Sequence, residues 1–371
     1  MSRPTLYLAI TNHGFGHAVR AASIASQIQK LCPDILLIFV TTAPHWLLES
    51  YLEGDFIHRP RGFDVGVIQS DSMTMDLNVT LEKLQEIHHQ QSAIIASEVT
   101  FIRQNQVDLI LADIPPLAAP LAKAAGIPCW MMSNFGWDFI YRDWGGDFIK
   151  IADWIEECFH QCDHLFRLPF HEPMSAFPQI QDVGLTGGNP RYNLEELRQD
   201  FQLYTQREQT ILLTFGGLHL SAIPYQNLSE FPDWKFITFD QNAPELPNLV
   251  NVNISRLSPS QIEQYPHLRP VDFMPLCGRV ISKPGYSTFA EALRLEIPVV
   301  SLMREGFAEA PLLLEGIQNY AYHQIIEPAK FFHSHWEFLH HPLEEPRLSR
   351  KLDKNGSETI AQAVVNFLTS L

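Results

Sequence analysis

The stretch that decides the fold of this 371-residue sequence reads Ser282-Lys283-Pro284-Gly285-Tyr286-Ser287-Thr288-Phe289-Ala290-Glu291-Ala292-Leu293. The apolar pair Val280-Ile281 precedes it, and an apolar run at 297–302 follows it. This order predicts a strand, a turn of small residues, a helix and a second strand. In open α/β sheets, ligands bind beyond the carboxyl ends of the strands, where the helices begin. We therefore expect a binding site at this turn.

Several residues of this stretch are suited to binding a phosphate and a sugar. Gly285 allows the backbone to approach a ligand closely, and the free N–H groups at a helix start attract phosphate. Ser287 and Thr288 offer hydroxyls, and Glu291 can accept hydrogen bonds from a sugar or ribose. The pattern Thr288-x-x-Glu291 is also that of a capping box, which would serve only the helix. The stretch alone leaves both interpretations open.

The composition indicates a globular protein of about two domains. Hydrophobic residues make up 46% of the chain, and its formal net charge of −16 gives no electrostatic footprint for nucleic acid or anionic membranes. No apolar run reaches transmembrane length, and the N-terminus leads straight into a strand pattern, so we expect neither a membrane span nor a signal peptide. Five scattered cysteines indicate reduced thiols and a cytoplasmic localisation.

The N-terminal half begins with a strand, a glycine loop and a helix. The apolar run 6–10 predicts a buried strand, and the loop His13-Gly14-Phe15-Gly16-His17 follows it. Gly14 and Gly16 match two glycines of the dinucleotide fingerprint, but Val19 stands at the third, and no acidic ribose partner follows at the expected distance. The two histidines are better suited to proton transfer than to binding a dinucleotide. The alternative is that they pack against or cap the first helix.

Polar residues stand where two further strands of this half end. Asp113 follows the apolar run 109–112, and Asn134 follows the strand predicted at 127–132. Because parallel strands end at the same edge of a sheet, we expect both side chains to lie near the histidine loop. Trp137 and Asp138 come shortly afterwards and could line the same site, although Trp137 could equally be a core residue.

A second α/β series begins near residue 182, after a linker marked by three prolines. Its strand at 211–215 leads into Gly216-Gly217, and Glu305 and Glu309 follow the strand at 297–302. We therefore expect an N-terminal domain at 1–168, a linker at 169–180 and a C-terminal domain at 181–355. A terminal helix at 356–371 is expected to pack back on the N-terminal domain.

One segment, Cys158-x-His160-x-Cys162-x-His164, has the side chains of a metal site but not the spacing of one. Zinc sites use paired Cys-x-x-Cys or similar spacings, and no second cluster complements this one. The chain also has no Asp-x-Asp pair, which would bridge a diphosphate through a metal. We expect no metal.

Two α/β halves joined by a linker imply a cleft between them. A histidine from one half can take a proton from a hydroxyl, and an acidic partner can fix its tautomer. A nucleotide diphosphate at a helix start in the other half would be a good leaving group. These parts describe the transfer of a sugar from a nucleotide to an acceptor hydroxyl.

The sequence resembles glycosyltransferases of the GT-B fold, in which two Rossmann-like α/β domains face each other across a cleft. The motif Ser282-x-x-Gly285-x-Ser287-Thr288-x-x-Glu291-Ala292 is similar to the donor motif of the lipid-linked N-acetylglucosamine transferases of peptidoglycan synthesis, and the loop 14–17 to their glycine loop. The plant-type UDP-glycosyltransferases carry a catalytic histidine in that loop, paired with an aspartate. This resemblance implies that His17 is the base, with His13 as the second choice, and that Asp113 is its partner.

The same resemblance implies the remaining site residues. The donor, a UDP-sugar, would be held by Gly216, Gly217, Lys283, Gly285, Ser287, Thr288, Glu291, Glu305 and Glu309. Asn134, Trp137 and Asp138 would line the acceptor side. The reaction would be inverting and independent of metal or any other cofactor. Glu305 and Glu309 replace the usual His and Gln after the donor strand, which leaves the sugar undefined.

The sequence also resembles the N-terminal, transferase-like half of plant L-arabinokinases. The segments concerned are 13–18, 133–141, 215–217, 283–292 and 307–311, and the kinase module of those proteins has no counterpart here. This resemblance raises a second hypothesis, a non-catalytic protein that binds a nucleotide-sugar and regulates or senses. A third is a nucleotide-sugar epimerase using Glu305, Glu309 and His219.

Overall fold

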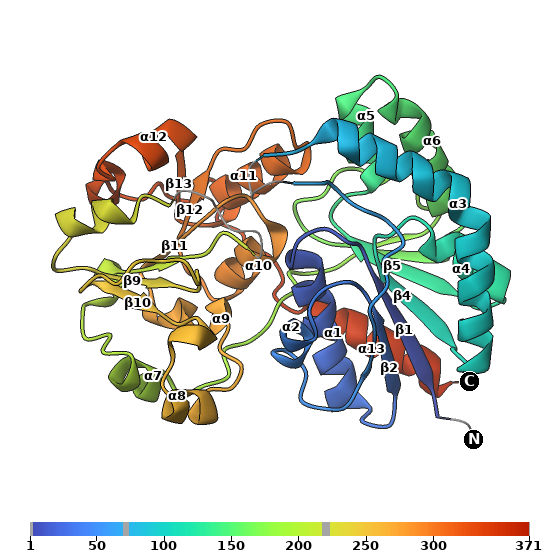
Figure 1. Ribbon diagram of the computed structural model, residues 1–371, viewed down its shortest axis with the longest axis horizontal. Helices are drawn as coiled ribbons and strands as arrows, with labels where there is room; N and C mark the ends of the chain where they lie inside the picture. Colours follow the sequence, from blue (N-terminus) through green and yellow to red (C-terminus); the bar gives the residue numbers. More distant parts are fainter. Residues whose placement is uncertain (1–2, 70–73, 217–222, 371) are drawn as a thin grey trace.

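Two α/β units lie side by side in the computed structural model of the protein (Figure 1). The structure describes residues 3–69, 74–216 and 223–370. Residues up to Asp182 form the N-terminal unit, and most of the remaining residues form the C-terminal unit. Each unit contains its own parallel sheet. The expected fold class, two Rossmann-like units, is confirmed.

The sheet of the N-terminal unit has seven strands among the described residues, in the order β3-β2-β1-β4-β5-β6-β7. Every neighbouring pair is parallel. Its strands are β1 (Thr5–Ile10), β2 (Leu36–Val40), β3 (Ile57–Arg59), β4 (Leu109–Asp113), β5 (Cys129–Ser133), β6 (His164–Arg167) and β7 (Ile180–Asp182). Because β7 pairs with β6, this sheet runs on past the expected linker.

Helices cover both faces of this sheet, which is why its central strands are apolar except at their ends. Its helices are α1 (Gly16–Leu31), α2 (His45–Glu49), α3 (Leu77–Gln104), α4 (Ala118–Ala125), α5 (Trp137–Trp144) and α6 (Phe148–Phe159). Successive residues of β1 point to opposite faces. Leu6 and Leu8 therefore pack on the face of α1, whereas Tyr7 and Ala9 pack on the face of α3 to α6.

The register of the sheet brings the polar strand ends together. Ile10, the last residue of β1, is paired with Asp113, the last residue of β4. The backbone N–H of Thr11 continues this pairing by donating to the carbonyl oxygen of Asp113, 3.0 Å away. The loop that carries the two histidines therefore begins directly beside Asp113.

The sheet of the C-terminal unit has six parallel strands in the described part of the chain, in the order β10-β9-β8-β11-β12-β13. They are β8 (Thr210–Leu213), β9 (Lys235–Thr238), β10 (Leu249–Asn251), β11 (Arg279–Ser282), β12 (Val299–Leu302) and β13 (His323–Ile326). The helices of this unit are α7 (Leu194–Asp200), α8 (Pro259–Gln264), α9 (Pro270–Phe273), α10 (Tyr286–Arg294), α11 (Glu309–Tyr320) and α12 (Pro328–His333). The opening stretch of the sequence is thus β11, its turn and α10, in the middle of the sheet.

The last helix, α13 (Gly356–Thr369), follows the C-terminal unit in sequence but packs on the N-terminal one. Figure 1 shows it beside α1, on the far side of the molecule from β8–β13. Its residues Ile360, Val364 and Leu368 are buried with the apolar face of α1. One helix therefore ties the two units together through a common core.

Caps determine element boundaries that apolar runs alone do not show. The long helix α3 begins at Leu77, because the side chain of Asp76 accepts a hydrogen bond from the N–H of Val79 and caps it. The strand expected at 127–132 is β5, shifted to Cys129–Ser133. Local apolar runs indicate an element but not the residue at which a cap ends it.

We predict that shortening a buried side chain on α13 destabilises the whole protein. Ile360 is fully buried, so Ile360→Ala should lower the free energy of unfolding by about 2–4 kcal/mol. Urea denaturation would measure the loss, and Gln362→Ala, on the exposed side of the same helix, is the control. Equal stability of the two variants would contradict the packing described for α13.

Candidate active site between the two units

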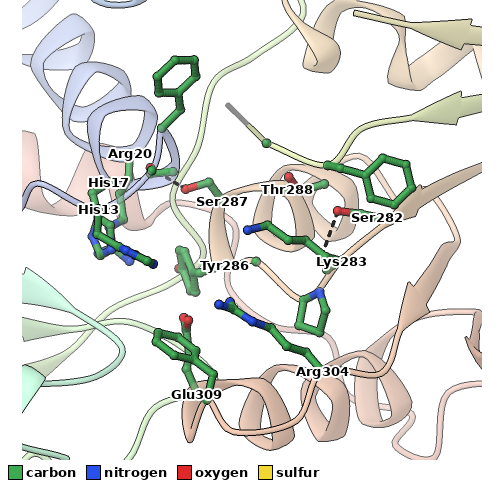
Figure 2. A pocket seen from close by; sticks show the side chains of 18 of the residues that line it. His13, His17, Arg20, Ser282, Lys283, Tyr286, Ser287, Thr288, Arg304 and Glu309 are labelled. Carbon is green, nitrogen blue, oxygen red and sulfur yellow. Dashed lines mark hydrogen bonds between the residues drawn. The ribbon is translucent and has the colours of Figure 1, made fainter. Parts of the chain in front are cut away.

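A pocket lies between the two units, at the carboxyl ends of the strands of both sheets. Its N-terminal side is formed by the loop after β1 and the start of α1, together with Asn134. Its C-terminal side is formed by Gly216, the β11–α10 turn and the segment after β12. Figure 2 shows His13, His17 and Arg20 on one side, facing Lys283 and Arg304 on the other. The location is the one expected for ligand binding in an open α/β sheet.

His17 and Asp113 form a hydrogen-bonded pair on the N-terminal side. His17 is the second residue of α1, and its Nδ1 lies 2.7 Å from Oδ1 of the fully buried Asp113. Because an ionised carboxylate only accepts hydrogen bonds, Nδ1 donates, and Nε2 of His17 is left as a proton acceptor. Burial raises the pKa of Asp113, but the charges of Arg20 and His17 outweigh burial and hold the pKa below its usual value. The pair has the form of a base with an orienting carboxylate.

Arg20 is a member of this site that the sequence analysis missed. Its Nε donates to Oδ2 of Asp113 over 2.7 Å, and its Nη2 donates to the other oxygen. Nη1 donates to Oδ1 of Asn134 over 3.1 Å, and the guanidinium lies over the ring of Tyr286. Arg20 stands three residues after His17, so helical spacing places both on one face of α1. That spacing is the signal by which it could have been found.

Two hydrogen bonds join the units across the pocket. The amide nitrogen Nδ2 of Asn134 donates to Oε1 of Glu309, 2.8 Å away. The hydroxyl of Ser287 donates to the carbonyl oxygen of Gly16, also over a short distance of 2.7 Å. Asn134, Glu309 and Ser287 thus all line the pocket, and in this structure each of them also forms a hydrogen bond to the facing unit.

His13 is held in the opposite tautomer to His17. The backbone N–H of Val67 donates to its Nδ1 over 3.4 Å, so the proton resides on Nε2. Burial, followed by the charges of His17, Lys283 and Arg304, lowers the pKa of His13 well below its usual value. The ring stacks on Phe307 of the C-terminal unit. A neutral imidazole that donates from Nε2 is suited to orienting a substrate and not to removing a proton.

The turn after β11 presents the start of α10 to the pocket. Gly285 is the N-cap residue, with no side-chain cap, and Thr288 already lies in the first turn of the helix. The capping-box interpretation of Thr288-x-x-Glu291 is therefore wrong, because a capping box requires Thr288 at the N-cap itself. Lys283, Gly285, Ser287 and Thr288, four of the residues predicted to bind the donor, all line the pocket.

Glu291, which was predicted to bind the donor, does not line the pocket. Its Oε1 accepts hydrogen bonds from the N–H of Gly188 at 2.9 Å and from the hydroxyl of Tyr51 at 3.3 Å. Burial raises the pKa of Glu291 to about 7, against the opposing effects of the Gly188 hydrogen bond and of nearby arginines. In this structure Glu291 holds the segment before α7 and the N-terminal unit against α10.

The remaining predicted residues divide between pocket, core and surface. Gly216 lines the pocket, whereas Gly217 and His219 lie outside the described residues. Trp137 is fully buried, and its Nε1 donates to the hydroxyl of Thr11 over 2.9 Å. Trp137 therefore acts as the core residue that supports His13, with which it makes an edge-to-face contact. Asp138 is half-buried at the start of α5, and Glu305 is exposed; neither lines the pocket.

Arg304 is a second residue that the sequence analysis missed. It lies in the segment after β12, lines the pocket and is 7% exposed. No motif signals it, because only the packing of the two units shows that a charged side chain in this segment is buried.

The five cysteines are free, and Cys129, Cys158, Cys162 and Cys277 are buried. The thiol of Cys162 donates to backbone carbonyl oxygens of Cys129 and His164, which accounts for part of the alternating Cys/His segment. Within the described ranges, no group of three or more His, Cys, Asp or Glu side chains is arranged to hold a metal ion. No helix among the described residues is long and apolar enough to cross a membrane.

Solved structures with the same architecture include UDP-glycosyltransferases. An anthocyanidin 3-O-glucosyltransferase in complex with UDP matches with a TM-score of 0.61 at 11% identity, and each chain is covered completely. A UDP-glucosyltransferase from Polygonum tinctorium, complexed with 3,4-dichloroaniline, matches with the same TM-score at 14% identity and the same coverage. An enzyme from Phytolacca americana, complexed with UDP-2-fluoro-glucose and pterostilbene, matches at 0.58 and 12% over 94% of its chain. The protein thus has the GT-B fold of the UDP-glycosyltransferases.

Among curated proteins, the chain is similar to L-arabinokinase of Arabidopsis thaliana, at 28% identity over 319 residues. The match covers 84% of this chain but 29% of that protein, so the chain spans less than a third of the relative's length. The chain is a distant homologue of L-arabinokinase over most of its own length. It matches no protein-family model.

We predict that Asp113 and Arg20 are coupled in stability. Asp113→Ala leaves the buried Arg20 without its counter-charge and should cost about 3–5 kcal/mol. The double variant Arg20→Met/Asp113→Leu removes both charges and should recover much of that loss. Urea denaturation of the single and double variants measures the coupling, and strictly additive losses would show that the two charges do not depend on each other.

Glu291 should make stability depend on pH. Its pKa of about 7 in the folded protein exceeds the ordinary value of about 4.3 for an unfolded chain, so folding binds a proton. Its contribution is full below about pH 4 and is lost as the pH rises through about 7. In Glu291→Gln the free energy of unfolding should therefore fall less steeply with rising pH, by at most about 1.4 kcal/mol per pH unit.

Urea denaturation at several values between about pH 5 and about pH 8 would test this. Glu172, whose pKa burial also raises to about 7, contributes a similar slope that the variant leaves in place. Glu315→Gln, at an exposed position, is the control. An unchanged slope in Glu291→Gln would show that Glu291 titrates as an ordinary carboxyl group.

Proposed function

We propose that the protein is a glycosyltransferase that moves a sugar from a UDP-sugar to an acceptor hydroxyl, with inversion and without a metal. The observation that carries this proposal is the His17–Asp113 pair, which faces the start of α10 across one pocket. A proton acceptor and a phosphate-binding helix start are the two parts that such a transfer requires. The solved neighbours with UDP or a UDP-sugar in their names support the choice of nucleotide.

The C-terminal unit would hold the donor. The N–H groups at the start of α10 are unpaired within the helix, and they attract the diphosphate together with the ammonium group of Lys283. Gly285 and Gly216 leave room for the ligand, and the hydroxyl of Thr288 is available as a further donor. Glu309, which lines the pocket beside Asn134, would accept hydrogen bonds from sugar hydroxyls.

His17 would act as the base. Its Nε2 takes the proton of the acceptor hydroxyl as the oxygen attacks the anomeric carbon from the face opposite the diphosphate. The bond from the anomeric carbon to the diphosphate oxygen breaks, and its electron pair leaves with UDP. Asp113 stabilises the imidazolium that forms, through the 2.7 Å hydrogen bond to Nδ1. His13, neutral and donating from Nε2, would orient the acceptor.

The contacts of Arg20 favour a second candidate function, a protein that binds a nucleotide-sugar without transferring it. Both oxygens of Asp113 accept hydrogen bonds from Arg20, so the carboxylate has less charge to offer an imidazolium. The similarity to a part of L-arabinokinase is consistent with either function. Turnover separates the two candidates.

We predict that His17→Ala strongly slows transfer and retains donor binding. Wild-type protein should show an increased melting temperature with UDP, and should release UDP from a UDP-sugar in the presence of alcohol or phenol acceptors. His17→Ala should lower kcat/KM by about 10²–10⁴-fold, the usual contribution of a general base, and keep the UDP-induced shift. His160→Ala, at an exposed position, is the control.

Full turnover in His17→Ala would disprove the assignment of the base. A wild-type protein that binds UDP-sugars but neither transfers nor hydrolyses them would instead be the non-catalytic binder. A protein that binds no uridine nucleotide would refute both candidates.

A further inference from the structure

Arg304 is a buried cation that has no anionic partner among the residues that the structure describes. Its guanidinium extends into the pocket in Figure 2, and it lies 4.4 Å from the centre of the Phe307 ring. Its Nε and Nη2 are both buried without a hydrogen-bond partner among the described residues. Burial lowers the pKa of Arg304, which reflects the cost of keeping the charge away from water. A buried charge of this kind normally has a partner.

The other arginines buried near the unit boundary show what is missing. Arg20 binds Asp113 through Nε and Nη2, and Arg269 binds Asp272 through the same two nitrogens. Arg304 has the same two nitrogens, Nε and Nη2, on one edge of its guanidinium. Glu309 is the acidic group close enough to affect the pKa of Arg304, but it accepts a hydrogen bond from Asn134. Within the part of the chain that the structure describes, Arg304 forms no ion pair. A ligand anion would complete the pattern of Arg20 and Arg269.

The unpaired edge has the geometry that carboxylates recognise. Nε–H and Nη2–H point in parallel from one side of the guanidinium, and a carboxylate accepts both bonds at once. Asp113 and Asp272 are bound in this way inside the protein itself. A planar carboxylate is therefore the group that best fits Arg304.

The position of Arg304 indicates which part of the donor would carry this carboxylate. The diphosphate of the proposed donor is placed at the start of α10, beside Lys283. Arg304 lies after the neighbouring strand β12, in the segment that also carries Phe307 and Glu309. Its charge acts on His13, so it lies toward the N-terminal unit, where the transferred sugar has to meet the acceptor.

We propose that the transferred sugar is a uronic acid, whose carboxylate is bound by Arg304. The donor class is then a UDP-uronate, and Arg304 is a specificity-determining residue that distinguishes it from a neutral UDP-hexose. This inference rests on the proposed function, because it assigns the sugar at the same donor site. Glu309 would accept hydrogen bonds from the hydroxyls of the same sugar, and the positive charge of Arg304 offsets the negative charge of Glu309.

Binding measurements on the full chain test the proposal. Dissociation constants are determined by calorimetry for UDP, UDP-glucose, UDP-glucuronate and UDP-galacturonate. Wild-type protein should bind one of the uronates at least about tenfold more tightly than UDP-glucose, as a charge-assisted bidentate contact provides. Arg304→Gln should abolish this preference and leave the affinity for UDP within about twofold. Arg304→Lys keeps the positive charge but cannot form the bidentate contact, so it should retain part of the preference for the uronate.

Two controls show that the variants report on the ligand. Arg256→Gln removes a positive charge at an exposed position outside the pocket and should keep the full preference. Without ligand, Arg304→Gln should melt at the same temperature as wild type or higher, because it removes an unpaired buried charge. A lower melting temperature would assign Arg304 a structural role and overturn the proposal.

The remaining outcomes distinguish the uronate proposal from the glycosyltransferase proposal on which it rests. If Arg304→Gln weakens UDP as much as the uronates, Arg304 binds the diphosphate, and the uronate proposal is wrong. If wild-type protein binds UDP-glucose as tightly as both uronates, the proposal also fails, whereas the glycosyltransferase proposal stands. If no uridine nucleotide binds, both fail together.

Discussion

The buried carboxylate of Asp113 is the group on which the site depends. It stands at the end of β4 with no exposure to water, so it must be balanced by positive charge and hydrogen bonds. Arg20 supplies the charge, and His17 supplies a further donor. The same contacts fix the direction of both side chains on α1. The orientation of the histidine is therefore a consequence of burying an acid at the centre of the sheet.

From this carboxylate a chain of contacts reaches the opposite unit. Arg20 donates to Asn134, and Asn134 donates to Glu309 at the start of α11. Arg20 also lies over Tyr286, the first residue of α10. The residues that orient the proposed base thus also hold the donor side in place. A change in the relative position of the two units would act on both sides of the pocket at once.

The fold and part of the site could be predicted from the sequence, because they follow from local patterns. Apolar runs followed by glycine turns specify parallel strands, and parallel strands place Asp113 beside the His17 loop. Arg20 and Arg304 were missed, because their importance depends on which charges become buried when the units meet. The hydrogen bond that Glu291 accepts from the N–H of Gly188 was missed for the same reason. Motif spacing describes one segment at a time, and a contact between units lies in no single segment.

The position of α13 has a consequence for synthesis of the protein. The helix that covers α1 leaves the ribosome only after the whole C-terminal unit. At about 5–20 residues per second, the N-terminal sheet waits on the order of ten seconds for its final cover. During that time the apolar face of α1 is exposed to other nascent chains and to chaperones.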